Sequence, residues 1–517
     1  MNTEALISLA GYFVLMLAIG LYAYRESTDD SAGYLLGGRK LGPAVGALSA
    51  GASDMSGWML LGLPGAVFVS GLSEAWIAVG LTVGAFLNYL LVAPRLRVYT
   101  EYADDAITIP DYFEKRFHDT SRALRVLSSV VIIIFFTVYT SSGVVAGGKL
   151  FEASFGLDYT LGLFLTAGVV IAYTLFGGFL AVSLTDFVQG CIMFVALILV
   201  PIITINVLGG IDETAAILRA DNPAMLDMFR SALPGGGAEA VSLIALLSLL
   251  SWGLGYFGQP HIIVRFMAIR SLKDVAVARH IGMTWMIITV IGAVVVGLSG
   301  SAFAIANRAE VAEYLAGKGG LDAFDPETIF IVLSQVLFHP YLAGFLLAAI
   351  LAAIMSTISS QLLVSSSSLT EDFYKIFLRR GASDRELVAV GRVSVLAVSL
   401  IAIGLALDPT SNILDLVSNA WFGFGSAFGP VVLLSLYWQR MTRAGALAGM
   451  VTGAAVVLFW VYGPAGILDG VRAQTAAIIP GFALATGAVV LASLASRGVP
   501  EHVQTRHIEV TRRVAQG

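Results

Sequence analysis

The stretch that most constrains this chain is SAGASDMSGWMLLGLPGA, residues 49–66, which places the carboxylate of Asp54 inside a segment apolar enough to cross a bilayer. In hydrocarbon a charge or an unpaired backbone group costs several kcal/mol. The serines and glycines around Asp54 favour a helix that unwinds in mid-membrane and exposes carbonyl and N–H groups to an ion and a small zwitterion. The alternative is a close-packed helix interface of small residues. That alternative explains the glycines but not the carboxylate.

Composition places the whole chain in a membrane. Of 517 residues, 57% are hydrophobic and only 13% are charged. The net charge of −5, without a basic domain, argues against nucleic acid as a partner. The single cysteine, Cys191, excludes a disulfide framework and a Cys-based metal site, and is predicted to be a small core residue. The apolar run near the N-terminus has an acidic lead-in and predicts a membrane helix rather than a cleaved signal peptide.

Apolar segments of spanning length recur along the chain and predict an all-α membrane protein. Thirteen spans are expected, at residues 5–24, 42–68, 73–94, 123–150, 159–178, 182–208, 241–263, 280–306, 328–369, 389–407, 411–437, 444–463 and 473–495. The long segment 328–369 is predicted to begin with a short outer helix over 326–335 and to cross from Pro340.

Basic residues predict the orientation. With the N-terminus outside, 24 of the 30 Lys and Arg residues fall in inner segments. We therefore expect the N-terminus outside and the C-terminus in the cytoplasm. The polar tail 497–517 mixes charges without a core-forming pattern and is predicted to be flexible.

A second interrupted helix is predicted at LSWGLGYFGQP, residues 250–260, because glycines permit unwinding and a closing proline opposes the helix. Transporters built from inverted repeats carry such a pair of broken helices. Trp252, Tyr256 and Phe257 supply flat apolar surfaces with polar handles for a small ligand. An interfacial aromatic belt is the alternative for these side chains.

A third polar segment is AAIMSTISSQ, residues 352–361, in an otherwise aliphatic helix. Ala353, Ser356 and Thr357 share one helix face. Two hydroxyls facing unwound carbonyls would make an all-oxygen cage for a weakly held monovalent cation. The alternative is that both hydroxyls bond to their own helix and serve packing.

Three further residues are candidates from their positions. Tyr139, at about mid-depth in FFTVYTSSG, could cover a substrate, although a lone tyrosine is more often a core residue. Asp186 lies in SLTDFVQ, read as a short inner turn, and is predicted to cap the following helix or to line an inner exit. Arg39, in GGRKLGP, follows the charge rule or forms an inner gate.

Long motifs carry a resemblance to a known family. The chain resembles the sodium/solute symporter family, closest to its bacterial sodium/proline symporters, over nearly its whole length. The matching stretches are YLLGGRKLGP, LSAGASDMSGWMLLGLPGAVF, LRVYTEYADDAITIPDYF, WGLGYFGQPHI, LAAIMSTISSQLL, LTEDFYK and FGPVVLLSLYWQRMTRAGALAGM. The resemblance thins in the loops 209–240 and 305–327 and in the C-terminal tail.

The resemblance implies a leucine-transporter-like core of two inverted five-helix repeats. It divides the chain into an N-terminal extra helix and inner loop (1–41), a first repeat (42–208), an outer loop (209–240), a second repeat (241–437), two extra helices (438–496) and the tail (497–517). The two predicted broken helices then begin the two repeats, as this architecture requires.

The resemblance also implies site residues. Sodium would be held by the carbonyls of Ala52, Met55 and Ala353 and by the hydroxyls of Ser356 and Thr357. Asp54 would be essential in a supporting role. The proline pocket would comprise Ser56, Gly57, Tyr139, Trp252, Tyr256 and Pro260. Thr140 and Ser360 are small departures from the family pattern.

These expectations describe a non-enzymatic secondary transporter of the bacterial cytoplasmic membrane that imports L-proline with Na⁺. No organic cofactor and no obligate protein partner are expected beside the lipid bilayer. One alternative is a symporter of the same family for another amino acid, pantothenate or a sugar, because fold alone does not fix the substrate. The other is a transporter-like sensor, against which the short stretch after the last span counts.

Overall fold

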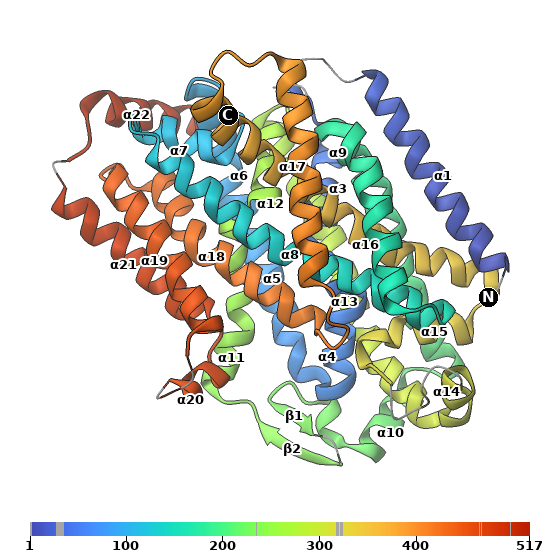
Figure 1. Ribbon diagram of the computed structural model, residues 1–517. Coiled ribbons are helices and arrows are strands. Elements are labelled where there is room, and N and C mark those ends of the chain that lie inside the picture. The colour runs from blue at the N-terminus through green and yellow to red at the C-terminus, as the bar shows by residue number, and fades with distance from the viewer. Residues whose placement is uncertain are drawn as a thin grey trace.

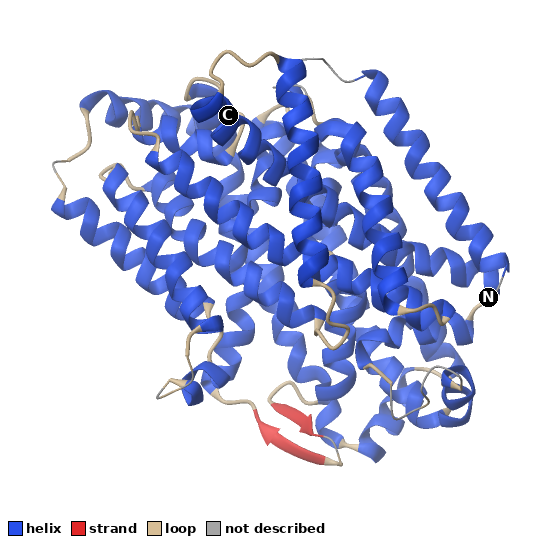
Figure 2. Cartoon of the chain, in the orientation of Figure 1, coloured by secondary structure: helices blue, strands red, loops and turns tan. Residues whose placement is uncertain are grey.

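The protein is a bundle of helices with one small hairpin at its end (Figures 1 and 2). The computed structural model describes residues 3–26, 36–233, 235–316, 320, 324–464, 466, 468–496 and 498–516. Within these ranges the two strands are β1 (Arg230–Leu233) and β2 (Gly237–Ala240), which pair antiparallel.

The first half of the chain supplies the first broken helix and three long helices; η denotes a short 3₁₀ or π-helical turn. In order, the elements are α1 Thr3–Glu26, η1 Gly37–Arg39, α3 Pro43–Asp54, η2 Trp58–Gly62, α4 Leu63–Ser70, η3 Gly71–Glu74, α5 Ala75–Leu87, η4 Asn88–Val92, α6 Ala93–Tyr102, α7 Ile109–Phe117, α8 Ala123–Phe155, α9 Tyr159–Val207, α10 Ile211–Asp221 and η5 Pro223–Leu226.

The second half follows the hairpin and contains the second broken helix. Its elements are α11 Leu243–Leu250, η6 Ser251–Gly258, α12 Pro260–Ala268, α13 Leu272–Ala306, α14 Arg308–Leu315, η8 Pro326–Thr328, α15 Ile329–Leu337, α16 Pro340–Ser367, η9 Ser368–Leu378, α17 Asp384–Leu405, α18 Ile413–Tyr437, α19 Arg443–Tyr462, α20 Asp469–Gln474, α21 Ile478–Ala495 and α22 Glu501–Gln516. The predicted short helix before Pro340 is confirmed as η8 and α15.

The predicted all-α membrane fold is confirmed, but the count of thirteen spans is not. In the described ranges ten helices are long and apolar enough to cross a membrane, or eleven if the bent pair at 243–258 and 260–268 is one span. Interruptions account for the difference. The segment 42–68 is divided at Asp54 into short helices. α9 is kinked at Gly178, so that 178–207 is a candidate span and only the shorter apolar helix Tyr159–Ala172 precedes the kink.

Burial identifies the middle of the bundle. In the most apolar stretch of the span Pro340–Leu378, which contains α16, 89% of the residues are buried. The corresponding shares of buried residues in α1, α19 and α21 are 22%, 33% and 28%. α16 packs against α1, α3, α8 and α9. The peripheral helices therefore leave apolar surface for lipid. Cys191, predicted to be a core residue, is exposed on α9, so that prediction was wrong.

The C-terminal tail is an ordered helix, which corrects its predicted flexibility. α22 packs against α6, with Val503, His507 and Val510 buried on one face. His507 Nδ1 lies 3.2 Å from Arg116 Nη2, and Arg506 pairs with Asp104 at 3.1 Å. The spacing of the three buried residues is that of an amphipathic helix, a signal hidden by the surrounding charges.

Candidate functional site

The first broken helix is interrupted where the sequence predicted. α3 ends at Asp54, Met55 and Ser56 are not helical, and a π-helical turn resumes at Trp58. The carbonyl of Asp54 accepts hydrogen bonds from Trp58 Nε1 at 3.1 Å and Tyr139 Oη at 3.3 Å. Side chains thus replace part of the lost helical hydrogen bonding, as buried backbone requires.

The predicted sodium ligands of α16 meet the end of α3. Ser356 Oγ donates to the carbonyls of Ala52, at 2.7 Å, and Ala353, at 3.1 Å. Thr357 Oγ1 lies 3.4 Å from the Ala52 carbonyl. Four of the five predicted ligands therefore converge as neutral oxygens in the buried middle of the bundle. Met55, the fifth, is buried at the end of α3, and the role of its carbonyl stays a prediction.

Asp54 faces the second broken helix rather than the oxygen cluster. Tyr256 Oη donates a hydrogen bond to Asp54 Oδ2. Asp54 Oδ1 has no hydrogen-bond partner among the described residues, although the residue is 2% exposed. A buried carboxylate with one unpaired oxygen is costly, and such groups in membrane spans mark functional sites.

The second broken helix is also present, with a bend of 45° between residues 243–258 and 260–268. The Trp252 carbonyl accepts from Trp421 Nε1 at 2.8 Å, and the Trp252 ring packs edge-on against Phe422. The Tyr256 ring packs edge-on against Trp421, with ring centroids 5.0 Å apart. α18 therefore fixes both aromatic candidates.

The six predicted substrate residues do not all line one cavity. Tyr139 and Tyr256 both contact Asp54, and the nearby Ser56 hydroxyl is buried without a partner among the described residues. Gly57 packs so closely that an added Cβ would lie 2.7 Å from that of Ala146 on α8. Pro260 lines a separate cavity, beside Phe179 and Val264.

A small cavity behind Asp54 contains a residue that the sequence analysis missed. Its lining includes Asp54, Met55, Asn88, Tyr89 and Tyr256, and its volume is about 20 Å³. Both amide atoms of Asn88 are buried without partners among the described residues. Asn88 begins the π-helical turn η4, and such turns are frequent at functional sites. The available signal was a lone asparagine in an apolar span.

Asp186 is not a helix cap, which corrects that prediction. The chain bends at Gly178 and not at Asp186, so Asp186 lies inside α9 and not at the start of a helix. Its side chain is fully buried. Its Oδ2 accepts from Ser49 Oγ at 2.8 Å and Ser53 Oγ at 3.1 Å, and lies 3.3 Å from Arg265 Nη2.

Arg265 completes this network, although the sequence analysis counted it as an inner-loop charge. It is fully buried in α12 and donates to Ser360 Oγ at 2.5 Å and to the His261 carbonyl at 2.6 Å. Ser360 also lies 2.9 Å from Ser53. The pair links α3, α9, α12 and α16 one helical turn from the oxygen cluster.

Arg39 joins three segments at one end of the bundle. It pairs with Asp105 at 2.9 Å and donates to the carbonyls of Met267, at 2.8 Å, and Ala106, at 2.7 Å. Burial lowers the pKa of Arg39, and Asp105 partly offsets the effect. Arg39 therefore ties the turn before α3 to the loop after α6 and to α12, a position suited to the predicted inner gate.

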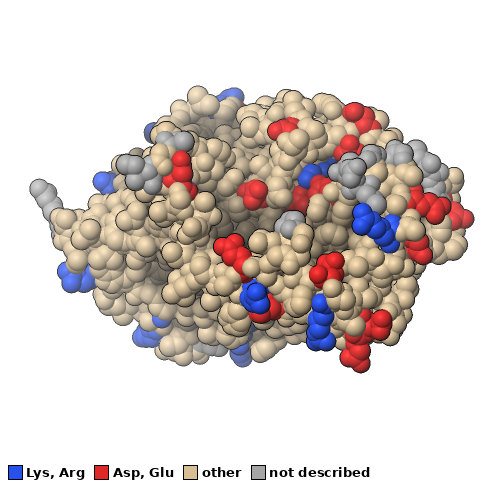
Figure 3. All heavy atoms as spheres, turned by 90° about the horizontal axis from the view of Figure 1, so that it is seen from below, with Lys and Arg blue, Asp and Glu red and all other residues tan. Residues whose placement is uncertain are grey.

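A second buried ion pair was not predicted from the sequence. It lies near the C-terminal end of α8. Lys149 Nζ is 2.8 Å from Asp325 and 2.7 Å from Glu327. Glu327 also accepts from the backbone N–H of Ile413, at the start of α18. The face on this side, seen in Figure 3, carries acidic side chains around a central hollow.

Comparison with known proteins agrees with this geometry. The chain is 58% identical over 499 residues to the osmoregulated proline transporter OpuE of Bacillus subtilis, covering 96% of each chain. It is 55% identical to the high-affinity proline transporter PutP of the same organism, covering 94% of this chain and 97% of the relative. A sodium/proline symporter of Staphylococcus aureus is 53% identical, covering 89% and 86%.

Solved structures show the fold. A Na⁺-coupled sialic acid symporter in a substrate-bound outward-open state matches with a TM-score of 0.79 at 17% identity, covering 97% of this chain and 99% of that one. Mhp1, a nucleobase-cation-symport-1 family transporter, matches with a TM-score of 0.54 at 12% identity, covering 92% and 98%.

The chain has two broken helices, and buried neutral oxygens meet where the first of them contacts α16. Together with the fold, these features define a membrane transporter with a leucine-transporter-like core. The family model described as the sodium:solute symporter family matches residues 34–453. The chain belongs to the sodium:solute symporter family, and it is a multi-pass protein of the bacterial cytoplasmic membrane.

Proposed function

We propose that the protein imports L-proline together with Na⁺ by alternating access. The observation that carries this proposal is the convergence of Ala52, Ala353, Ser356 and Thr357 oxygens at the break in α3, two residues before Asp54. Unwound carbonyls and hydroxyls are the ligands that transporters of this architecture offer to Na⁺. The relatives named proline transporters and sodium/proline symporters support both solutes.

Sodium would bind at this oxygen cluster, with the Met55 carbonyl as a further ligand, and would hold the unwound segment in one conformation. The segment continues directly into Ser56 and Gly57. The positive N-terminal end of the half-helix that follows the break would receive the carboxylate of proline. Sodium and proline would then strengthen one another's binding by the same factor.

The apolar ring would lie against Tyr139, Trp252 and Tyr256, whereas Pro260 lines a separate cavity. Asp54, which Tyr256 holds, is the only charged side chain among the described residues that line the cavity behind this pocket. A site with no second charge favours a neutral amino acid. We further propose that residues 42–208 and 241–437 are the two inverted repeats and that the N-terminus is outside.

The test is uptake of labelled proline into proteoliposomes. An inward Na⁺ gradient should drive accumulation, and an equal K⁺ gradient should not. Unlabelled proline should compete, whereas glucose, pantothenate and betaine should not. Na⁺-driven uptake of one of those solutes without uptake of proline would reject the substrate and keep the symporter architecture.

A further inference from the structure

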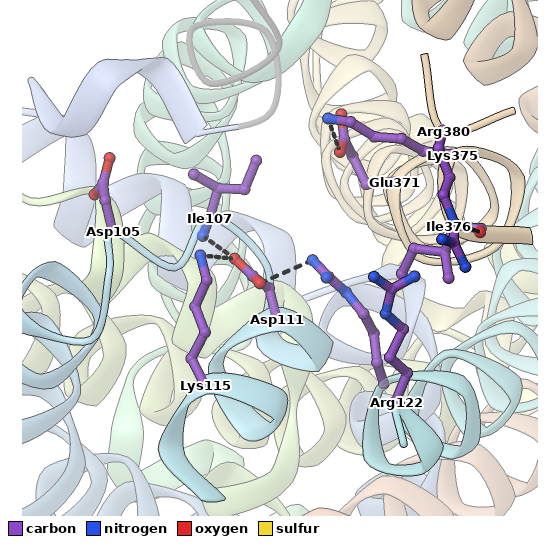
Figure 4. A pocket seen from close by; sticks show the side chains of 10 residues that line it. Asp105, Ile107, Asp111, Lys115, Arg122, Glu371, Lys375, Ile376 and Arg380 are labelled. Carbon is purple, nitrogen blue, oxygen red and sulfur yellow. Dashed lines mark hydrogen bonds and ion pairs between the residues drawn. The ribbon is translucent and has the colours of Figure 1, made fainter. Parts of the chain in front are cut away.

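A cavity rich in basic side chains lies among the start of α7, the start of α8 and the end of η9. Its volume is about 390 Å³ (Figure 4). The basic residues that line it are Lys115, Arg122, Arg125, Lys375 and Arg380, and the acidic ones are Asp105, Asp111 and Glu371. None of these residues belongs to the site proposed for sodium and proline.

The carboxylates in this cavity are already engaged. Asp111 pairs with Lys115 at 2.8 Å and with Arg125 at 2.8 Å. Glu371 pairs with Lys375 at 2.7 Å, and Asp105 with Arg39. Among the described residues, Arg122 and Arg380 have no carboxylate within ion-pair distance. Two guanidinium groups therefore remain to attract an anion into the cavity.

The two arginines lie at the ends of membrane spans. Arg122 directly precedes the span at 123–155, and Arg380 follows the span at 340–378 by two residues. Phe377 and Leu378, just before Arg380, are 59% and 77% exposed. Exposed apolar side chains at the end of a span are suited to contact with lipid, and phospholipid headgroups lie at that depth.

We propose that this cavity binds the phosphate group of an anionic phospholipid, with Arg122 and Arg380 as its cationic ligands. A guanidinium donates two parallel hydrogen bonds to phosphate oxygens. The acyl chains lie along Phe377 and Leu378. Free phosphate has the same oxygens but makes no use of these apolar side chains, which favours the lipid.

The test compares purified full-length protein titrated with short-chain phosphatidylglycerol, phosphatidylcholine or inorganic phosphate, with binding followed by native mass spectrometry. Phosphatidylglycerol should bind more tightly than either alternative. Arg122→Gln/Arg380→Gln should weaken its binding about 30-fold, equivalent to about 2 kcal/mol. Arg122→Lys/Arg380→Lys keeps the charge but not the paired hydrogen bonds, so its affinity should lie between those of the parent protein and the Gln variant.

Arg440→Gln is the matched control, because Arg440 is an exposed arginine between α18 and α19 outside the cavity. It should leave phosphatidylglycerol binding unchanged. Equal binding by the Arg122→Gln/Arg380→Gln variant and the control would reject the site. Inorganic phosphate binding as tightly as phosphatidylglycerol would reject the lipid as its occupant. Neither outcome depends on which solute the protein transports.

Discussion

The oxygen cluster at Ala52 and the ion pair of Asp186 with Arg265 are neighbours, and both use residues of α3 and α16. α3 and α16 supply Ala52 and Ser356 to the first, and Ser53 and Ser360 to the second. The cluster consists of neutral oxygens, whereas the second site consists of fully buried opposite charges. Neutral oxygens can take up and release a monovalent cation at modest cost. A buried ion pair cannot be opened cheaply, so it holds α9 and α12 against α3 and α16.

The largest effect on stability should come from removing one partner of the ion pair between Asp186 and Arg265. Arg265→Leu leaves Asp186 buried without its cation, which costs about 3–5 kcal/mol of folding free energy. We expect a strongly lowered midpoint of thermal unfolding in detergent, with or without Na⁺. Arg265→Leu/Asp186→Asn should recover most of the loss because it removes both charges. A single variant as stable as the parent would show that the pair does not hold the helices together.

The next effect concerns the carboxylate between the two broken helices. Asp54→Asn keeps the shape and can still accept from Tyr256, but it removes the charge. Because hydrogen bonds to charged groups are worth about 1.5–3 kcal/mol, uptake at low Na⁺ should fall about 10- to 100-fold while folding is retained. Initial rates of proline uptake at several Na⁺ concentrations measure it. Parent-like uptake at low Na⁺ would assign Asp54 a purely structural role.

The neutral cluster should respond differently from the ion pair. Ser356→Ala/Thr357→Ala removes two candidate ligands and leaves no buried charge, so the unfolding midpoint without Na⁺ should change little. The Na⁺ concentration for half-maximal uptake should rise about 30-fold, if each hydroxyl contributes about 1 kcal/mol. Ser359→Ala, on the same helix but outside the cluster, is the matched control. An unchanged Na⁺ requirement in the double variant would leave these hydroxyls only a packing role.

The smallest effect concerns a polar contact at the edge of the bundle, where α22 packs on α6. Burial, together with Arg116 and Arg95, lowers the pKa of His507 to about 4. The unfolded helix takes up a proton below about pH 6.5, and the docked helix does not. Docking is therefore strongest above pH 6.5 and weakens toward pH 4, by about 1 kcal/mol at pH 6. This contact should therefore loosen in mild acid.

Hydrogen exchange in α22 at pH 7.5 and pH 6, corrected for intrinsic rates, measures this weakening. His507→Gln should remove the pH dependence. A pH dependence that persists in that variant would contradict its assignment to His507.

The two neighbouring sites differed in how far the sequence could predict them. The interruption at Asp54 was visible because a carboxylate among glycines is costly in an apolar span. The shared face of Ala353, Ser356 and Thr357 follows from helical spacing alone. Their meeting with Ala52 depends on the packing of α16 against α3, and the sequence suggested it through the family resemblance.

The ion pair could not be predicted in the same way. Arg265 follows an apolar run and Asp186 follows a polar one, so both resembled residues at the ends of spans. Their pairing depends on the bend of α9 at Gly178 and the course of α12 after its break, which bring together residues 79 apart in the chain. Asn88 was missed because a π-helical turn has no sequence period of its own.

The most direct test of the central claim is the affinity for proline measured in Na⁺ and in K⁺, in the parent protein and in Ser356→Ala/Thr357→Ala. We expect Na⁺ to tighten proline binding to the parent protein by about tenfold or more, within the usual range of coupling free energies. In the double variant, at the same salt concentration, the affinity for proline in Na⁺ should approach the affinity for proline in K⁺. Proline binding that is equally tight in Na⁺ and K⁺, or a double variant with undiminished coupling, would contradict a sodium site at Ala52 that governs the substrate site.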